Sequence, residues 1–487
     1  MSLNSNVLRN PKWLSNVRLE ESGIEEQTAE NPWNKIEECR SPFLKDYGSV
    51  IHSAIFRRLA HKTQVVLNPK IDFPRSRLTH SLEVEQLSRQ IVRVFCKLLT
   101  GKLSARIPEN FAKDFEDATA TACLAHDLGQ PPFGHCTDKT LDKLLKNETN
   151  GREDFCGNRQ ILRVVHKTSV RHGLNLTSSV LDGLQKYKSR NIFPKKAPSC
   201  YSSEDGIYRK IILNCDTADF RNPICYIMEA ADDIAYLSGD IEDACKNEIL
   251  TEPLIEKFFK DFFGYGANWN KIDSIGEWTK IFRLCNSESN FEDLKSAIIK
   301  PMILHVSQVL EHCISDLDSL ENLPMVLHAG VFPGAAQNEL NLCYYDLGPN
   351  KFGTISKEFK RRVYSELILQ DSNVNESELA AKYIVENLWK ALIPIAQNYD
   401  SDESQKLLKI LPKHVKNKIE LAFETKYTKQ CIEKGLHKSK NHSQQGSQEN
   451  SLSCDIKYRI LADYIAGMTD RYAIYMSEKL NGKLAFK

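Results

Sequence analysis

Apolar residues recur along much of this chain at steps of three and four positions, which is the spacing of one face of an α-helix. In residues 81–99 the positions on one stripe are Leu87, Ile91, Val94 and Leu98. Residues 111–127 repeat the pattern through Phe111, Phe115, Ala118, Ala122 and Ala125. Both segments are therefore predicted to form helices with one buried face.

The second of these helices is predicted to end in the stretch AHDLGQPPFGH, residues 125–135. Gly129 stands where a left-handed C-terminal cap is expected, and Pro131 follows where the helix must already have stopped. His126 and Asp127 are thereby placed at a helix end.

Two later segments also have helical spacing. In residues 222–245 one side of the predicted helix carries Ile227, Ala230, Ile234, Leu237 and Ile241. The other side carries Asp232, Tyr236 and Asp240 at positions i, i+4 and i+8. In residues 458–476 the spacing runs through Leu461, Ile465, Met468, Tyr472 and Tyr475, which predicts a C-terminal helix.

Strand signals are few, and the best is a short hairpin within NLCYYDLGPNKFGTIS, residues 341–356. The predicted fold class is all-α with at most this β-hairpin. Residues 1–30, acidic between Glu20 and Glu30, are expected to form an N-terminal arm. Residues 437–455 are nearly free of apolar side chains at their start, so burial cannot offset the entropy of ordering them and a mobile loop is expected. Residues 456–487 are expected to pack back on the core.

Composition excludes several classes of protein. The 487 residues are 41% apolar and 26% charged with a net charge of +1, so overall charge does not indicate a nucleic-acid partner. The sequence has neither a signal-peptide pattern nor an apolar run long enough to cross a bilayer, and a cytoplasmic protein is expected. The 14 cysteines contain no CxxC pair, which argues against zinc ribbons and thioredoxin-type centres and favours reduced thiols.

The His126-Asp127 pair suggests a hydrolytic metal site, because imidazole and carboxylate groups are ligands of divalent ions. The candidates for two further ligands are His80 and Asp232, each on a separate predicted helix and off its apolar stripe. Taken singly these signals are weak. A lone histidine is more often an ordinary surface or core residue, and the acidic line through Asp232 and Asp240 is more often a solvated face.

Six blocks of the sequence, taken together, resemble the deoxyguanosine triphosphate triphosphohydrolases of the HD-domain superfamily. They are HSAIFRRLAHKTQV, RSRLTHSLEV, ACLAHDLGQPPFGH, CGNRQILRVVH, YIMEAADDIAYLSGDIEDA and LADYIAGMTDRYA, in that order between residues 52 and 473. The resemblance implies an all-helical enzyme that cleaves a deoxynucleoside triphosphate to the deoxynucleoside and inorganic triphosphate. It implies an HD-type core over residues 31–255 and a helical region, 256–436, that completes the nucleotide pocket.

The resemblance also assigns roles to residues. His80, His126, Asp127 and Asp232 take the positions of four ligands to one divalent ion, Mg²⁺ or Mn²⁺. Asp232 is preferred to Asp233 because it keeps the family spacing to Tyr236 and Asp240. Other positions implied to contact the substrate are Arg77, Arg58 and Lys186 at the triphosphate, Gln64, Tyr236 and Asp240 at the sugar, and Asn158. For each of these an ordinary surface polar group is the alternative.

The leaving group of this reaction is a sugar alkoxide, which needs a proton as it departs. His135 is the predicted acid, because the two prolines of QPPFG restrict the chain that leads to it. Asp138 is predicted to orient His135. Many bacterial members have glutamate there, after HxGE, whereas this chain reads HCTD, and the shorter side chain puts that role in question.

Two other functions compete with this prediction. One is an HD phosphodiesterase or nucleotidase, which the AGMTDRYA block disfavours. The other is a single-stranded nucleic acid binding protein with weak or no turnover, favoured by the lysines between Lys406 and Lys440. Because some family members bind single-stranded DNA and form homo-oligomers, often hexamers, both properties are expected here, with dGTP as the family substrate. GPNKFGT, residues 348–354, lacks the lysine of a phosphate loop.

Overall fold

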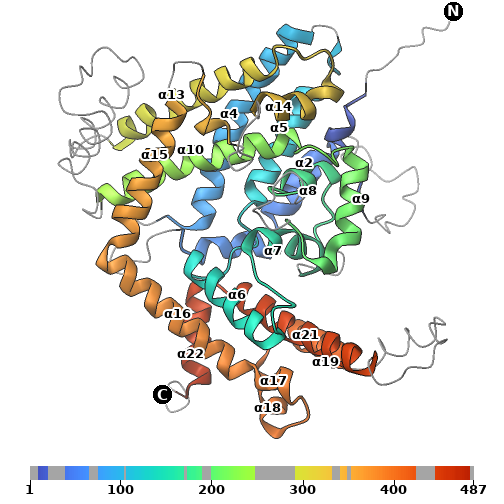
Figure 1. The fold of residues 1–487 in the computed structure, drawn as a ribbon, viewed down its shortest axis with the longest axis vertical. Helices are drawn as coiled ribbons and strands as arrows, with labels where there is room; N and C mark the ends of the chain where they lie inside the picture. Colours follow the sequence, from blue (N-terminus) through green and yellow to red (C-terminus); the bar gives the residue numbers. More distant parts are fainter. Residues whose placement is uncertain are drawn as a thin grey trace, which may run out of the picture. The chain divides into compact units, whose positions relative to one another are not determined.

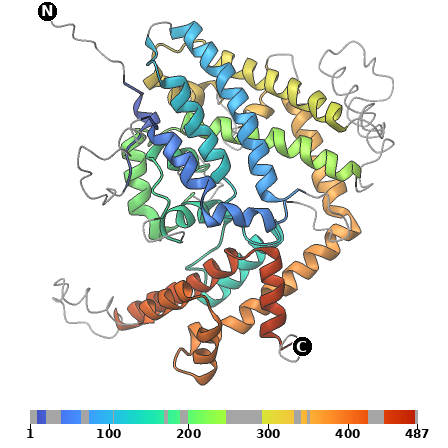
Figure 2. The same cartoon turned by 180° about the vertical axis from the view of Figure 1, so that it is seen from behind.

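The computed structural model describes residues 9–19, 39–64, 75–103, 106–168, 173–188, 199–246, 291–331, 341–347, 352–423 and 445–482. Helices dominate these residues (Figures 1 and 2), and the predicted all-α class is confirmed. An isolated bridge pairs Arg18 with Thr177. The chain divides into two compact units, of which the first comprises residues 1–60, 64–128 and 158–375, and the second residues 61–63, 129–157 and 376–487.

The first unit contains most of the helices. Its longer α-helices are α2 (Pro42–Ile51), α4 (Arg77–Leu103), α5 (Phe111–Ala125), α9 (Asp205–Cys215), α10 (Pro223–Lys246), α13 (Phe291–Cys313), α14 (Leu323–Val331) and α15 (Phe352–Arg362). Shorter α-helices are α3 (Ala54–Arg58), α7 (Gly157–Arg163) and α8 (Ser178–Gly183). Two π-helical segments, η4 (Val164–Thr168) and η9 (Val363–Leu367), follow α7 and α15. Short 3-10 turns are η1 (Lys12–Leu14), η2 (Leu59–His61), η5 (Ser202–Glu204), η7 (Leu320–Asn322), η8 (Leu342–Tyr344) and η10 (Ile368–Gln370).

Helices α4, α5 and α10 pack against one another at the centre of this unit, and α13 lies along α10 (Figure 1). The apolar stripe predicted for α5 is confirmed, because all five of its residues are buried. The stripe predicted for α4 is wrong in its second half. Val94 is 39% exposed, and Phe95 and Leu99 are buried in its place, since the ring of Phe95 packs edge-on against Phe115 in α5.

The predicted N-terminal arm is wrong for residues 9–19. Trp13 and Leu14 are buried in the core of the first unit, where the Trp13 ring meets Phe111 and Phe115 edge-on at centroid distances of 5.9 and 5.1 Å. The Trp13 Nε1–H donates to the carbonyl of Leu320 at 2.7 Å. Burial of one large aromatic ring therefore holds a segment whose neighbours are polar.

The hairpin predicted for residues 341–356 is also wrong within the described part of that segment. Residues 342–344 form the turn η8, in which Leu342 and Cys343 are buried, and α15 begins at Phe352. The Asn341 side chain accepts a hydrogen bond from the Cys343 backbone N–H, which stabilises a tight turn where the apolar residues had suggested a strand.

The second unit is built from α6 (His135–Thr149), α17 (Pro394–Gln397), α18 (Asp402–Ile410), α19 (Lys413–Phe423), α21 (Gln445–Ala466), α22 (Asp470–Leu480) and most of α16 (Ser372–Leu392). Arg152 and Arg459 form ion pairs with Asp455 and Glu153, which join α21 to the segment after α6. The C-terminal helix predicted across residues 458–476 is instead two helices. The Thr469 hydroxyl accepts from the Tyr472 N–H and so starts α22.

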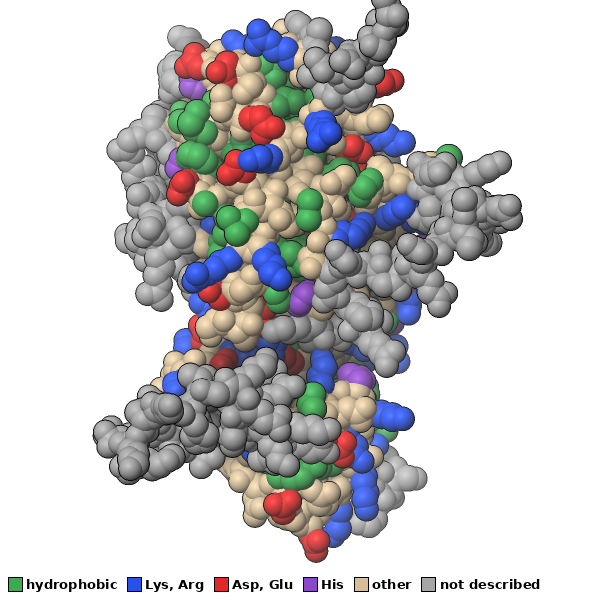
Figure 3. Space-filling model, turned by 90° about the vertical axis from the view of Figure 1, so that its right-hand side faces the viewer, with side chains coloured by type: hydrophobic (Ala, Val, Ile, Leu, Met, Phe, Trp, Pro, Cys, Tyr) green, Lys and Arg blue, Asp and Glu red, His purple; other side chains and the backbone are tan. Residues whose placement is uncertain are grey.

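Helix α21 begins at Gln445, inside the segment predicted to be a mobile loop, while residues 437–444 lie outside the described part. A polar start is compatible with a helix whose later residues, such as Leu461 and Ile465, are buried. The described helices include none with the length and apolarity needed to span a membrane. On the face drawn in Figure 3, lysine and arginine side chains are interspersed with aspartate and glutamate over the coloured surface.

Candidate metal centre

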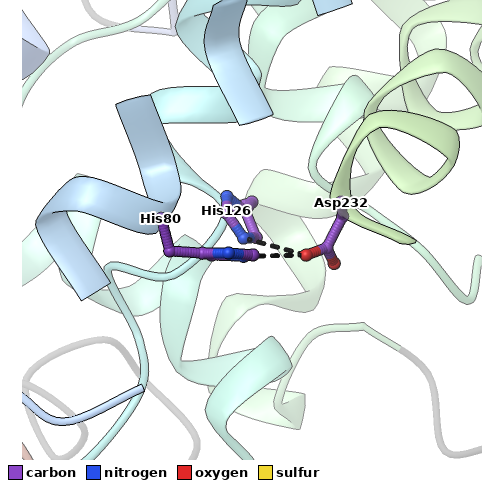
Figure 4. Close-up of side chains that lie close together, drawn as sticks. All are labelled: His80, His126 and Asp232. Atoms are coloured by element: carbon purple, nitrogen blue, oxygen red, sulfur yellow. Dashed lines mark hydrogen bonds and ion pairs between the residues drawn. The ribbon is translucent and has the colours of Figure 1, made fainter. Parts of the chain in front are cut away.

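His80, His126 and Asp232 point toward one another in the first unit (Figure 4). Each offers one ligand atom, and the three atoms lie within 4.8 Å of one another. The Nε2 atoms of His80 and His126 are 3.0 and 3.5 Å from the same Asp232 carboxylate oxygen. Two imidazoles and a carboxylate at this spacing form a donor set suited to a divalent ion.

Three central helices bring these side chains together. His80 is in the first turn of α4, His126 is the C-cap of α5, and Asp232 is on α10. The Nδ1 atom of His126 lies 2.6 Å from the carbonyl oxygen of Cys123. Because a carbonyl oxygen only accepts, Nδ1 carries a proton, which leaves Nε2 as the nitrogen available to a metal ion. This is the tautomer that binds a metal through Nε2.

Asp127, the fourth predicted ligand, lies at the edge of this group. One of its carboxylate oxygens is 3.7 Å from His126 Nε2, and the other accepts from Arg77 Nη1 at 2.8 Å. Burial raises the pKa of Asp127, but Arg77 and the two nearby histidines outweigh it, so that the pKa falls to about 2. The structure therefore keeps this carboxylate ionised beside the histidines.

Asp232 also has a cationic partner. The Nζ atom of Lys186 is 3.3 Å from the second oxygen of Asp232. Burial alone would raise the pKa of Asp232, but Lys186 and His126 hold it well below its usual range. Burial likewise opposes a charge on His126, yet Asp127 and Asp232 raise its pKa. The carboxylates are thus in the ionised state that metal ligands require, whereas the raised pKa of His126 favours its imidazolium form, so binding of a metal ion would displace a proton from His126.

Asp233, adjacent to Asp232, faces different partners. Its carboxylate accepts from Lys360 Nζ and from the Asn341 side chain. Lys360 Nζ lies 4.8 Å from the centre of the Tyr236 ring, and Tyr364 packs edge-on against the same ring at 5.2 Å. Asp232, and not Asp233, therefore lies in the group with His80 and His126. The sequence had given no reason to single out Lys360, which comes from a helix more than 100 residues away.

The remaining predicted contacts lie in several places. Arg58 is an exposed residue at the end of α3, and Asn158 is half-buried in the first turn of α7. Gln64 is half-buried, and its backbone N–H donates to the Arg75 carbonyl. Asp240 belongs to α10, but its side chain lies outside the described part of the structure.

His135 and Asp138 belong to the second unit, at the start of α6. His135 is exposed, and one oxygen of Asp138 accepts from the Gly157 backbone N–H at 2.8 Å. The left-handed cap predicted at Gly129 is wrong. Positive φ occurs instead at Phe133 (59°) and Gly134 (71°), because the turn into α6, rather than the end of α5, makes the sharp reversal.

Arg75 is a structural residue that the sequence did not reveal. Its guanidinium forms ion pairs with Glu242, Asp243 and Glu83 and donates to the Gly239 carbonyl at 3.0 Å. Arg75 therefore joins the segment before α4 to the C-terminal part of α10. Helix α4 carries His80, and α10 carries Asp232. A Cβ atom at Gly239 would lie 3.1 Å from the Arg75 Nε atom, so a glycine suits this approach.

Comparison with known proteins agrees with this geometry. Residues 77–173 match the HD domain family, and residues 403–479 match the phosphohydrolase-associated domain family. A deoxyguanosinetriphosphate triphosphohydrolase-like protein of Listeria innocua is 28% identical over 97% of this chain and 99% of its own length. A deoxyguanosinetriphosphate triphosphohydrolase of Klebsiella pneumoniae is 25% identical over 88% of this chain and 92% of its own length. A triphosphohydrolase-like protein of Bradyrhizobium diazoefficiens is 39% identical over 42% of this chain and 48% of its own length.

Proposed function

Because residues 77–173 match the HD domain family and triphosphohydrolase-like relatives align over nearly the whole chain, we propose that the protein hydrolyses deoxynucleoside triphosphates, dGTP foremost, to the deoxynucleoside and inorganic triphosphate. The observation that carries the proposal is the convergence of His80, His126 and Asp232 from three helices onto one point. The relatives named for this reaction extend over nearly the whole chain, which favours a triphosphohydrolase over a phosphodiesterase or a monophosphate nucleotidase.

His80, His126, Asp127 and Asp232 would hold the metal ion, Mg²⁺ or Mn²⁺. A bound divalent ion would supply Lewis-acid activation of water and of the α-phosphate oxygens. The protein residues orient this chemistry. The Cys123 carbonyl fixes the tautomer of His126, and Arg77 keeps Asp127 ionised.

Arg77, which is buried, and Lys186, which is partly buried, would supply positive charge beside the triphosphate that the proposal requires. Arg77 pairs with Asp127, and Lys186 pairs with Asp232. If those two carboxylates bound a metal ion, Arg77 and Lys186 would be able to pair with phosphate oxygens instead. Arg58, Gln64, Asn158, Tyr236 and Asp240 are proposed as further substrate contacts. Tyr236, enclosed by Lys360 and Tyr364, is proposed to stack beneath the sugar, where a ribonucleotide 2′ hydroxyl would clash.

His135 is proposed to donate the proton that the departing 5′ oxygen needs, with Asp138 orienting it. The overall balance is one water consumed per nucleotide. Its oxygen ends on the α-phosphate, the P–O5′ bond breaks, and a proton ends on the 5′ oxygen.

The test is product analysis with purified protein, Mn²⁺ or Mg²⁺ and each of the four dNTPs. Deoxynucleoside and triphosphate are expected as first products, with the fastest turnover on dGTP. Orthophosphate or pyrophosphate as a first product would refute the point of attack. Asp232→Asn should abolish Mn²⁺ binding in a calorimetric titration, whereas the adjacent Asp233→Asn, which faces Lys360, should retain it.

We also propose a homo-oligomer, with a hexamer expected, in the cytoplasm. Light scattering of the purified protein tests the assembly. Single-stranded DNA binding is a weaker proposal, because Lys416, within the described part of the lysine-rich segment, pairs with Glu420 at 3.5 Å. Salt-dependent binding of single-stranded DNA without hydrolysis of any dNTP would favour that function over the enzyme.

A further inference from the structure

The turn formed by residues 130–134, which directly precedes His135, has an uncommon backbone conformation. Phe133, which is not a glycine, has φ 59°, and Gly134 has φ 71° and ψ −143°. Such conformations persist only where the surroundings hold them, and they concentrate at functional sites. The contacts that hold this turn therefore bear on the position of His135, its immediate neighbour.

A buried carboxylate binds the turn from a distant part of the sequence. Asp470, the first residue of α22, is 6% exposed. One of its oxygens accepts from the Phe133 backbone N–H at 2.9 Å. The other accepts from the backbone N–H and the hydroxyl of Thr63 at 2.8 and 2.6 Å. One carboxylate thus joins the residue of positive φ to the segment that directly precedes Gln64.

A buried cation binds the other end of the same turn. Lys62 is 4% exposed, and its Nζ donates to the carbonyl oxygens of Gln130 at 2.5 Å and Ala466 at 2.9 Å. Ala466 ends α21, and Asp470 begins α22, so both contacts come from the same helical corner. Burial of a charged lysine or aspartate is costly unless the charged group forms hydrogen bonds. Here both Lys62 and Asp470 form hydrogen bonds with the backbone of the turn 130–134.

We propose that Lys62 and Asp470 are positioning residues that fix the turn 130–134 and thereby aim His135 for proton transfer to the leaving group. This inference rests on the proposed function, in which His135 is the acid. Neither residue is assigned a contact with the substrate. The hydrogen bonds of Lys62 and Asp470 join three segments far apart in the sequence, residues 61–63, 129–134 and 466–470, which belong to one compact unit.

The test separates proton donation from every other requirement of the reaction. Turnover is measured on dGTP and on its analogue with sulfur in place of the 5′ bridging oxygen. A thiolate leaves without a proton, so loss of the acid slows only the oxygen substrate. His135→Ala is the reference variant, with an expected loss of about 100-fold or more on dGTP and little loss on the sulfur analogue.

Asp470→Asn and Lys62→Met are expected to repeat that pattern, with losses of about 10- to 100-fold on dGTP alone. Lys62→Arg, which can still donate to both carbonyls, should restore most of the rate. Thr63→Val removes only one hydroxyl donor and should produce a smaller loss of the same kind, which keeps the proposal testable if a charged-residue variant does not fold. The matched control is Asp455→Asn, an equally buried carboxylate of the same unit that binds Arg152 and not the turn. It should slow neither substrate selectively.

The outcomes distinguish the two levels of the proposal. If His135→Ala slows both substrates equally, the acid assignment is wrong, and the positioning role falls with it. If His135→Ala is selective but Asp470→Asn, Lys62→Met and Thr63→Val slow both substrates equally or neither, the proposed acid stands and the positioning role is refuted. Melting temperature and Mn²⁺ binding, measured on every variant, identify losses caused by unfolding.

Discussion

Replacement of Lys186 by methionine is expected to destabilise the metal-free protein much more than the metal-loaded protein. The variant leaves the partly buried Asp232 carboxylate without the ammonium group 3.3 Å away. At an effective dielectric constant of about 20, the Coulomb energy of two unit charges at that separation is about 5 kcal/mol. Removal of one partner of a buried ion pair costs about 3–5 kcal/mol in measured cases. The side chains of Lys186 and Asp232 are 14% and 25% exposed, so we expect a loss at the lower end of that range.

A divalent ion bound by Asp232 would supply the missing positive charge. The loss caused by Lys186→Met should therefore shrink on addition of Mn²⁺, and Mn²⁺ should raise the melting temperature of the variant more than that of the unaltered protein. The assay is thermal unfolding of both proteins in excess chelator and in a series of Mn²⁺ concentrations. It reports on the metal site without any requirement for turnover.

Lys188→Met is the matched control. Lys188 pairs with Asp182 at 2.5 Å, both side chains are fully buried, and neither belongs to the His80, His126 and Asp232 group. Its loss of stability should be the same with and without Mn²⁺. If the loss caused by Lys186→Met is equally insensitive to Mn²⁺, the reasoning that places an ion at Asp232 is refuted.

Three further predictions follow from the described contacts. Trp13→Ala should lower the free energy of unfolding by about 3–5 kcal/mol in urea titrations; a loss below about 1 kcal/mol would mean that the N-terminal segment is not packed in solution. In metal-free protein Asp127, whose pKa is lowered from 3.8 to about 2, should contribute about 2 kcal/mol above pH 4 that is lost as the pH falls toward 2; Arg77→Met should remove most of that pH dependence, and an unchanged dependence would contradict the assigned cause. Asp127→Ala should weaken Mn²⁺ binding in calorimetry, whereas His135→Ala should leave it unchanged, and the reverse result would exchange their roles.

Local sequence was sufficient for the elements that carry the metal centre. The period of α5 and its end near His126 follow from apolar spacing and the residues after it, and those features need no distant partner. The same reasoning was wrong about Gly129, because a glycine after a helix permits a left-handed cap without requiring one. It was also wrong about residues 341–356, where a side-chain hydrogen bond from Asn341 competes with strand formation.

Sequence reasoning failed most clearly where one residue has partners far along the chain. A polar N-terminal segment gave no sign that Trp13 would fill a gap between α5 and Leu320. Arg75 and Lys360 resembled many other basic residues, and only their carboxylate partners distinguish them. Glu242 and Asp243 lie 167 and 168 residues from Arg75, and Asp233 lies 127 residues from Lys360. Signals of this kind are absent from any short window of sequence.

Residue chemistry identifies the side chains that could bind a metal ion, because imidazole and carboxylate groups are metal ligands. Apolar spacing predicts the helices that carry them, because helical periodicity is a local property of the chain. The tertiary structure decided which of these groups meet. Packing of α4, α5 and α10 turns Asp232 toward the two histidines and Asp233 toward Lys360, although the two aspartates are chemically identical neighbours. Their surroundings then set their charge. Burial raises the pKa of both carboxyls, but Lys186 and His126 outweigh it at Asp232, whereas Lys360 does not outweigh it at Asp233.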